Sequence, residues 1–196
     1  MKDTAVESLH DQQAAPPEQA GTSIIGLTIP LAVGAAVSVA LGVYGGLHDP
    51  TDRAVNVAGF SSPLAVKAWL TTAALALAVV QVVTAAGMWG RLGLGNKSWT
   101  APVHRWSGRL AVLATLPVVA HCLYALGFEH DSTRVLVHSL LGCFFFGAFT
   151  CKMLALPRHD LPSWVIPVLG GLVTVGLVAL WLTSSLWFFT TFGITT

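Results

Sequence analysis

The sequence predicts an all-α integral membrane protein with five transmembrane helices. Of its 196 residues, 54% are hydrophobic and only 10% are charged, whereas a typical soluble domain has about 25% charged residues. Five apolar stretches are each close to the ~20 residues that a helix needs to cross the hydrocarbon core of a bilayer. Because lipid offers no hydrogen-bond partner to an open backbone, each stretch is expected to be a helix.

The five predicted spans follow one another with short polar links between them, in a single domain over residues 23–196. They cover residues 23–47, 64–89, 103–126, 135–156 and 163–189. The short links predict that consecutive helices are antiparallel neighbours. Residues 1–22 are polar, contain Pro16 and Pro17 and have no apolar run. They predict a disordered cytoplasmic tail rather than a signal peptide.

Lysine and arginine are unequally shared between the two sides of the membrane. The side with the N-terminus and the second and fourth links has seven of them, and the opposite side has three. Since cytoplasmic links are enriched in these residues, we expect a multi-pass protein of the plasma (inner) membrane, with the N-terminus cytoplasmic and the C-terminus extracytoplasmic. The net charge of +1 gives no basic field for phosphate, so nucleic acid is not an expected partner.

Two histidines form the main candidate site. His121 lies about six residues before the third span ends, and His138 about four residues after the fourth begins. At 1.5 Å per residue, both are within ~6–9 Å of the outer end of their helices. Two neutral imidazoles at one depth on facing helices are what the iron of a b-type haem needs. Gly142, one turn below His138, would admit the flat macrocycle, and Arg134, one turn above, suits a haem propionate.

Other interpretations of this pair are open. The two histidines could hydrogen-bond neighbouring helices without any cofactor, or could serve another metal or a proton path. A compact zinc site would need three or four close ligands, for which only Cys122, Glu129 and His130 lie near the required depth. A second, stacked haem would need ligands about 13 or 14 residues away on each helix. Those positions hold no histidine, so we expect one haem.

A second polar group is predicted at the inner side, formed by His104, Arg105, Arg109 and Lys152. Lys152 lies 14 residues after His138 and therefore on nearly the same helix face. The group could bind a quinone or an anion, or it could form part of a proton path. The lysine could instead extend its ammonium group to the interface, and His104 could be an interfacial anchor. Gln81, an isolated amide in the second span, is expected to join helices by hydrogen bonds.

Two segments resemble helices of ferric reductase and cytochrome b561-like membrane cytochromes. One is HRWSGRLAVLATLPVVAHCLYALGF, from His104 to Phe128, and the other is VHSLLGCFFFGAF, from Val137 to Phe149. The resemblance implies that His121 and His138 bind haem. The whole chain also resembles a family of small, uncharacterised bacterial five-helix membrane proteins, often actinobacterial.

Together these observations predict a cytochrome-like electron-transfer subunit with one bis-histidine haem b near the outer face. It would exchange electrons with quinone or with a periplasmic or extracellular redox protein. Two alternatives are a membrane subunit or scaffold without a cofactor, and a small proton or ion transporter that uses buried histidine and lysine. No Asp or Glu lies within any span, which disfavours a proton relay.

Overall fold

The described chain is a bundle of long helices. The computed structural model describes residues 23–51, 59–92 and 97–196, and the predicted tail 1–22 lies outside them. Within these residues the elements are a short turn at Ile24–Leu27, α1 (Thr28–Leu47), α2 (Pro63–Met88), α3 (Thr100–Ala120), α4 (Thr133–Ala155), α5 (Val165–Trp181) and α6 (Trp187–Phe192). A π-helical segment, His121–Leu126, extends α3, and a second, Leu182–Leu186, joins α5 to α6.

Within the described residues, the prediction of five apolar helices long enough to span a membrane is confirmed. Five continuous helical stretches are long and apolar enough to cross a membrane: Ile24–Leu47, Pro63–Met88, Thr100–Leu126, Thr133–Ala155 and Val165–Phe192. Their ends fall within three residues of the predicted ends, the largest differences being at Thr100 and Phe192. The hydropathy of the chain therefore located each helix closely.

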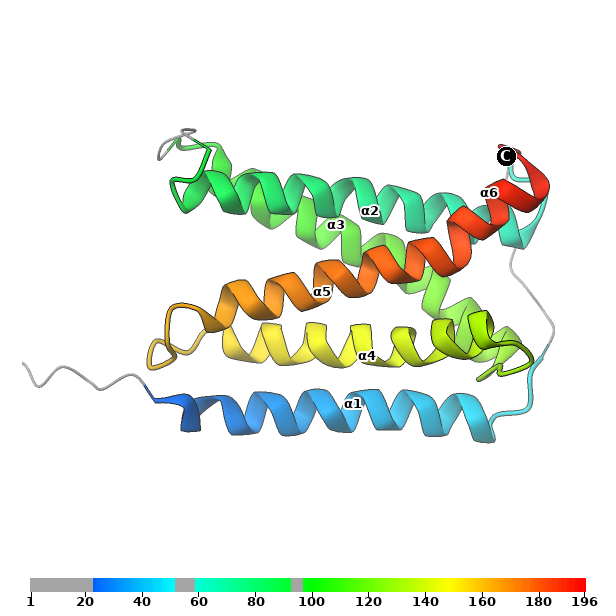
Figure 1. Ribbon diagram of the computed structural model, residues 1–196, viewed down its shortest axis with the longest axis horizontal. Coiled ribbons are helices and arrows are strands. Elements are labelled where there is room, and N and C mark those ends of the chain that lie inside the picture. Colours follow the sequence, from blue (N-terminus) through cyan, green and yellow to red (C-terminus); the bar gives the residue numbers. More distant parts are fainter. Residues whose placement is uncertain (1–22, 52–58, 93–96) are drawn as a thin grey trace, which may run out of the picture.

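The helices do not all pack against their sequence neighbours. α2 packs on α3 and α4 packs on α5, as expected, but α1 packs on α4 and α5 also touches α2. Figure 1 shows α5 running obliquely between the α2–α3 pair and the α4–α1 pair. The prediction that all consecutive helices are close neighbours is wrong for α1 with α2 and for α3 with α4. A short link makes two helices antiparallel, but side-chain shape decides which surfaces touch.

Glycine brings α1 and α4 together. A Cβ atom added to Gly34 would lie 2.6 Å from the carbonyl oxygen of Gly147, and one added to Gly147 would lie 2.5 Å from that of Gly34. The hydroxyl of Ser38 donates to the carbonyl oxygen of Cys143 at 3.0 Å in the same contact. Small residues that let two backbones approach, with a polar group between them, are the usual means of helix association in lipid.

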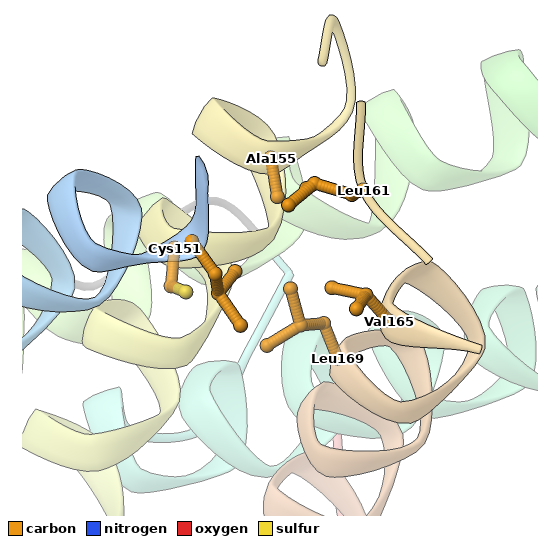
Figure 2. Packing of buried hydrophobic residues seen from close by; sticks show 6 residues of the cluster. Cys151, Ala155, Leu161, Val165 and Leu169 are labelled. Carbon is orange, nitrogen blue, oxygen red and sulfur yellow. The ribbon is translucent and has the colours of Figure 1, made fainter. Parts of the chain in front are cut away.

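The start of α1 is anchored by an apolar cluster that links it to α4 and α5. Figure 2 shows this cluster, whose buried members are Leu27, Cys151, Ala155, Leu161, Val165 and Leu169. The backbone N–H of Ser23 also donates to the carbonyl oxygen of Asp160 at 2.9 Å. These contacts hold the N-terminal end of the bundle, defined here as the end with Ser23 and the connections after α2 and α4.

The opposite end carries the connections after α1 and α3, together with Thr196, and is called the C-terminal end of the bundle (Figure 1). Two serine caps start helices there. The hydroxyl of Ser62 accepts from the N–H of Ala65 at 3.1 Å ahead of Pro63, and that of Ser132 accepts from Val135 at 3.3 Å. Such caps satisfy N–H groups that have no partner within the helix.

Candidate functional site

A cavity of about 100 Å³ lies inside the bundle and is lined by residues of all five long helices. Its polar lining is Thr71, Thr115, Cys122, His138, Ser139, Cys143 and Ser184, among apolar side chains such as Leu41, Val118, Phe145 and Leu177. Gly142 lines it as well, and a Cβ atom added there would meet nothing within 4 Å. The structure thus places His138 and Gly142 on one face, as their spacing predicts.

A threonine hydroxyl orients the ring of His138. Nδ1 of His138 lies 2.9 Å from Oγ1 of Thr183, and this hydroxyl donates its proton to the carbonyl oxygens of Ala179, at 2.9 Å, and Leu180, at 3.1 Å. A hydroxyl has one proton to give, so Thr183 accepts from His138 and the neutral imidazole carries its proton on Nδ1. The lone pair of Nε2 is then available to a ligand, as in metal-binding histidines that are held by an outer partner.

Arg134 is fixed to the same turn. Its guanidinium group donates to the carbonyl oxygen of Thr183 at 2.7 Å and lies 4.1 Å from the ring centroid of Trp187. The carbonyl belongs to the π-helical segment Leu182–Leu186, where the regular hydrogen-bond ladder is interrupted and carbonyl groups become available. Arg134 and His138 lie one turn apart on α4, and both form hydrogen bonds with Thr183.

Both π-helical segments border the cavity. Cys122 and Leu123 line it from the segment after α3, and Ser184 lines it from the segment after α5. A π-turn inserts one residue into a helix and changes the direction of the side chains that follow, and such turns are frequent at functional sites. The first segment begins four residues after Pro117, which has no N–H to donate to the preceding turn.

His121, the predicted partner of His138, lies at the start of the π-helical segment after α3 and is half-buried. It does not line the cavity that contains His138. Within the described residues, neither of its ring nitrogens has a hydrogen-bond partner. His121 begins the segment that follows α3, and His138 lies near the start of α4. The two histidines therefore belong to the same end of the bundle.

The predicted inner group is partly brought together at the N-terminal end. Nδ1 of His104 lies 3.0 Å from Oγ1 of Thr84, whose hydroxyl donates to Val80 at 2.7 Å, so this histidine is oriented as His138 is. Lys152 is half-buried and interacts electrostatically with His104. Arg105 and Arg109 are exposed instead, and Arg109 lies 5.1 Å from the ring centroid of Trp106.

Gln81 joins α2 to α3 beside His104, and it does so by hydrogen bonds as predicted. Its Nε2 donates to the hydroxyl of Ser107 at 2.9 Å and to the carbonyl oxygen of His104. A Cβ atom added to Gly108 would lie 3.0 Å from Nε2 of Gln81. The glycine therefore makes room for the amide that holds His104 in place.

Sequence reasoning missed two residues of the site at the C-terminal end. Thr183 lies 45 positions from His138, and only the packing of α5 on α4 brings the two together. Lys67, one of the three cations assigned to the outer side, lies within a span, where any ionisable residue is a functional candidate. No three His, Cys, Asp or Glu side chains in the described ranges are grouped as a metal site.

Comparison with known protein families places the chain in a family. A family model described as "Family of unknown function (DUF6529)" matches residues 27–196, which is most of the chain and includes every helix from α1 to α6. No curated protein and no solved structure matches the chain, so the resemblance to ferric reductases and cytochrome b561-like proteins gains no support from these comparisons.

Proposed function

Since the chain belongs to this family, for which no function is given, we propose a function from the site itself. The protein is a membrane b-type cytochrome subunit that holds one haem b between His138 and His121. Haem supplies reversible one-electron chemistry when it is bound. The chain's own contribution is to orient the ligands, exclude water and hold the ends of the macrocycle.

One observation carries the proposal: Oγ1 of Thr183 lies 2.9 Å from Nδ1 of His138. Here the hydroxyl proton of Thr183 is committed to backbone carbonyls, so the protonated nitrogen is defined and Nε2 keeps its lone pair. An outer hydrogen bond of this kind sets the tautomer and ring direction of metal-ligating histidines.

The surroundings of His138 fit a flat macrocycle. Gly142 leaves open space on the same face, and α3 and α4 face the cavity without packing closely on one another. At about 100 Å³ the cavity is smaller than the about 300–1,000 Å³ of typical sites for organic ligands. The proposal therefore requires α3 to shift relative to α4 when haem binds, bringing His121 to the iron.

Charge distribution supports an extracytoplasmic position for this site. The side of the chain at the N-terminal end of the bundle, including the tail and the helix ends, carries the excess of lysine and arginine, which is typical of the cytoplasmic side. His138 would then lie near the outer face of the plasma membrane. A centre at this depth suits electron exchange with quinone in the bilayer or with an extracytoplasmic redox protein.

The test is the absorbance spectrum of protein produced with added haem. The wild type is expected to show a Soret band of six-coordinate haem, and His138→Ala and His121→Ala should each lose it or convert it to a five-coordinate form. His159→Ala, at an exposed position in the connection between α4 and α5, is the matched control and should keep the wild-type spectrum.

Two outcomes would overturn the proposal. A wild type that takes up no haem would favour the alternative of a subunit without a cofactor, or of a transporter if liposomes showed pH-dependent flux. An unchanged six-coordinate Soret band in both histidine variants would mean that haem binds elsewhere or non-specifically.

A further inference from the structure

The cavity beside His138 has, as the helices stand, the size of a single small ring. Its volume of about 100 Å³ is of the same order as the about 150 Å³ of an engineered apolar cavity that holds benzene. The side chains of Phe128, Phe145 and Phe146 line it, together with several leucines and valines. A haem would need α3 to shift, whereas one aromatic ring needs no rearrangement.

The hydroxyl groups of this cavity present hydrogen-bond acceptors. The hydroxyls of Thr71, Thr115, Ser139 and Ser184 donate to the carbonyl oxygens of Lys67, Val112, Glu129 and Leu180 at 2.8, 2.7, 2.9 and 2.7 Å respectively. Because each hydroxyl has one proton, its lone pairs are what remains for a ligand. The thiols of Cys122 and Cys143, which also line the cavity, are weak donors. The cavity therefore favours a ligand that brings its own donor.

His138 offers the strongest of these acceptors. Its imidazole lines the cavity, whereas Thr183, which accepts from Nδ1, does not. The opposite edge of the ring, with Nε2, is thus the edge turned towards the cavity. Within the described residues, Nε2 has no hydrogen-bond partner. An acceptor that is removed from water without a donor is unfavourable, so a ligand hydroxyl at Nε2 would be stabilised.

A second hollow lies on the outside of the bundle, along the contact between α1 and α4 (Figure 1). This groove has a volume of about 440 Å³, and its lining consists of Ser38, Val39, Gly42, Val43, Phe128, Leu140, Cys143 and Phe144. Val39, Leu140 and Phe144 are exposed on the surface of the bundle. In a membrane-spanning bundle an exposed apolar surface of this kind faces lipid, so the groove can receive an alkyl chain from the bilayer.

The groove and the cavity share a boundary. Phe128 and Cys143 line both of them. Gly42 of α1 keeps this boundary thin, because a Cβ atom added there would lie 3.8 Å from Sγ of Cys143. A molecule with a ring in the cavity and a chain in the groove would therefore pass between α1 and α4 beside these two side chains.

We propose that the bundle binds a membrane amphiphile with a hydroxylated aromatic ring, of the class of long-chain phenols and hydroquinones. The ring occupies the cavity, its hydroxyl donates to Nε2 of His138, and its apolar chain lies in the groove between α1 and α4. The inference goes beyond the proposed function, because it concerns the arrangement in which α3 has not shifted. The ring and a haem would both use Nε2, so they exclude one another.

The test compares para-nonylphenol with its methyl ether, para-nonylanisole, which has the same ring and chain but no donor. Dissociation constants are measured by calorimetric titration of the full-length, haem-free protein in lipid nanodiscs, with empty nanodiscs as the blank. The wild type should bind the phenol about tenfold more tightly than the ether, the scale of a hydrogen bond whose loss leaves a buried acceptor unpaired. Equal binding of the two by the wild type overturns the inference and needs no variant.

His138→Leu should abolish the preference for the phenol, because it removes the acceptor. His104→Leu is the matched control, since His104 is also held through Nδ1 by a threonine but lies at the other end of the bundle. It should keep the preference. If His138→Leu also keeps it, the preference reflects the extra methyl group of the ether, and the role of His138 is wrong.

The position of the chain is tested with Gly42→Leu, whose side chain would fill the groove. This variant should weaken binding of para-nonylphenol but not of phenol itself, which has no chain. Gly171→Leu is the control, because a Cβ atom at Gly171 of α5 meets nothing within 4 Å and the residue lines neither hollow. Wild-type affinity for para-nonylphenol in Gly42→Leu would overturn the assignment of the chain to the groove.

Haem loading separates this inference from the proposed function. A wild type that takes up no haem but prefers para-nonylphenol supports the inference and overturns the haem site. Protein loaded with haem at His138 should lose the preference for the phenol. If it keeps the preference unchanged, the ring does not occupy Nε2 and the inference fails.

Discussion

Nδ1 of His138 on α4 lies 2.9 Å from Oγ1 of Thr183, in the π-helical segment that follows α5. The contact ties α4 to α5 at the C-terminal end of the bundle and defines the protonated nitrogen of the imidazole. Arg134 reinforces it by donating to the backbone carbonyl of the same threonine at 2.7 Å.

Replacing Thr183 by valine should therefore weaken ligand binding without unfolding the protein. The backbone carbonyl that Arg134 uses remains, whereas the acceptor for Nδ1–H is lost. Loss of such an outer partner typically lowers metal affinity about 10–100-fold, and haem retention measured by absorbance should fall in that range. Thr183→Ser should restore it, and Thr84→Val, which removes the equivalent contact of His104, should leave it unchanged. Full retention in Thr183→Val would show that the contact does not orient the ligand.

Enlarging Gly147 should separate α1 from α4. The added Cβ of Gly147→Ala would lie 2.5 Å from the carbonyl oxygen of Gly34 and would also collide with the hydroxyl of Ser38. Over-packing of this kind costs about 1–3 kcal/mol, which should appear as a lower midpoint of thermal unfolding in detergent. Gly171→Ala is the control, since its Cβ would meet nothing within 4 Å. Equal stability of the two variants would contradict the close approach of α1 and α4.

The amide of Gln81 and the small size of Gly108 should be energetically coupled. Gln81→Ala removes the donor to Ser107 and to the carbonyl of His104, and we expect a loss of about 0.6–2 kcal/mol. Gly108→Ala places a methyl group 3.0 Å from the amide nitrogen, so it should cost stability in the wild type but less in a Gln81→Ala background. Denaturation of the single and double variants measures the coupling. Additive effects would mean that the two residues act independently.

Labelling of introduced cysteines should reveal which end of the bundle faces the cytoplasm. Asp131→Cys and Ser98→Cys place exposed thiols at the C-terminal and N-terminal ends respectively. The excess of lysine and arginine at the N-terminal end predicts that a membrane-impermeant maleimide labels Asp131→Cys in intact cells and Ser98→Cys only after permeabilisation. The reverse pattern would invert the orientation and move His138 to the cytoplasmic side. The native cysteines Cys122, Cys143 and Cys151, which all lie within spans, set the background signal.

The sequence by itself determined the membrane helices and their limits, because a lipid-crossing backbone must be helical over ~20 apolar residues. The serines and prolines in the links mark where the helices begin, as Ser62, Pro63 and Ser132 show. The spacing of His138 and Gly142 also sufficed to place both on one face, since helical periodicity is local. These properties depend on residues that are close in the chain.

Only the tertiary structure decided which helices touch and which side chains surround each histidine. The spans that contain α2 and α4 have similar mean hydropathy, so hydropathy does not distinguish α4 from α2 as the neighbour of α1. That choice follows from the fit of Gly34 against Gly147. Likewise, Thr183 reaches His138 from a helix that is remote in sequence. Their partnership depends on shape complementarity between surfaces, a non-local property that no periodicity in the sequence encodes.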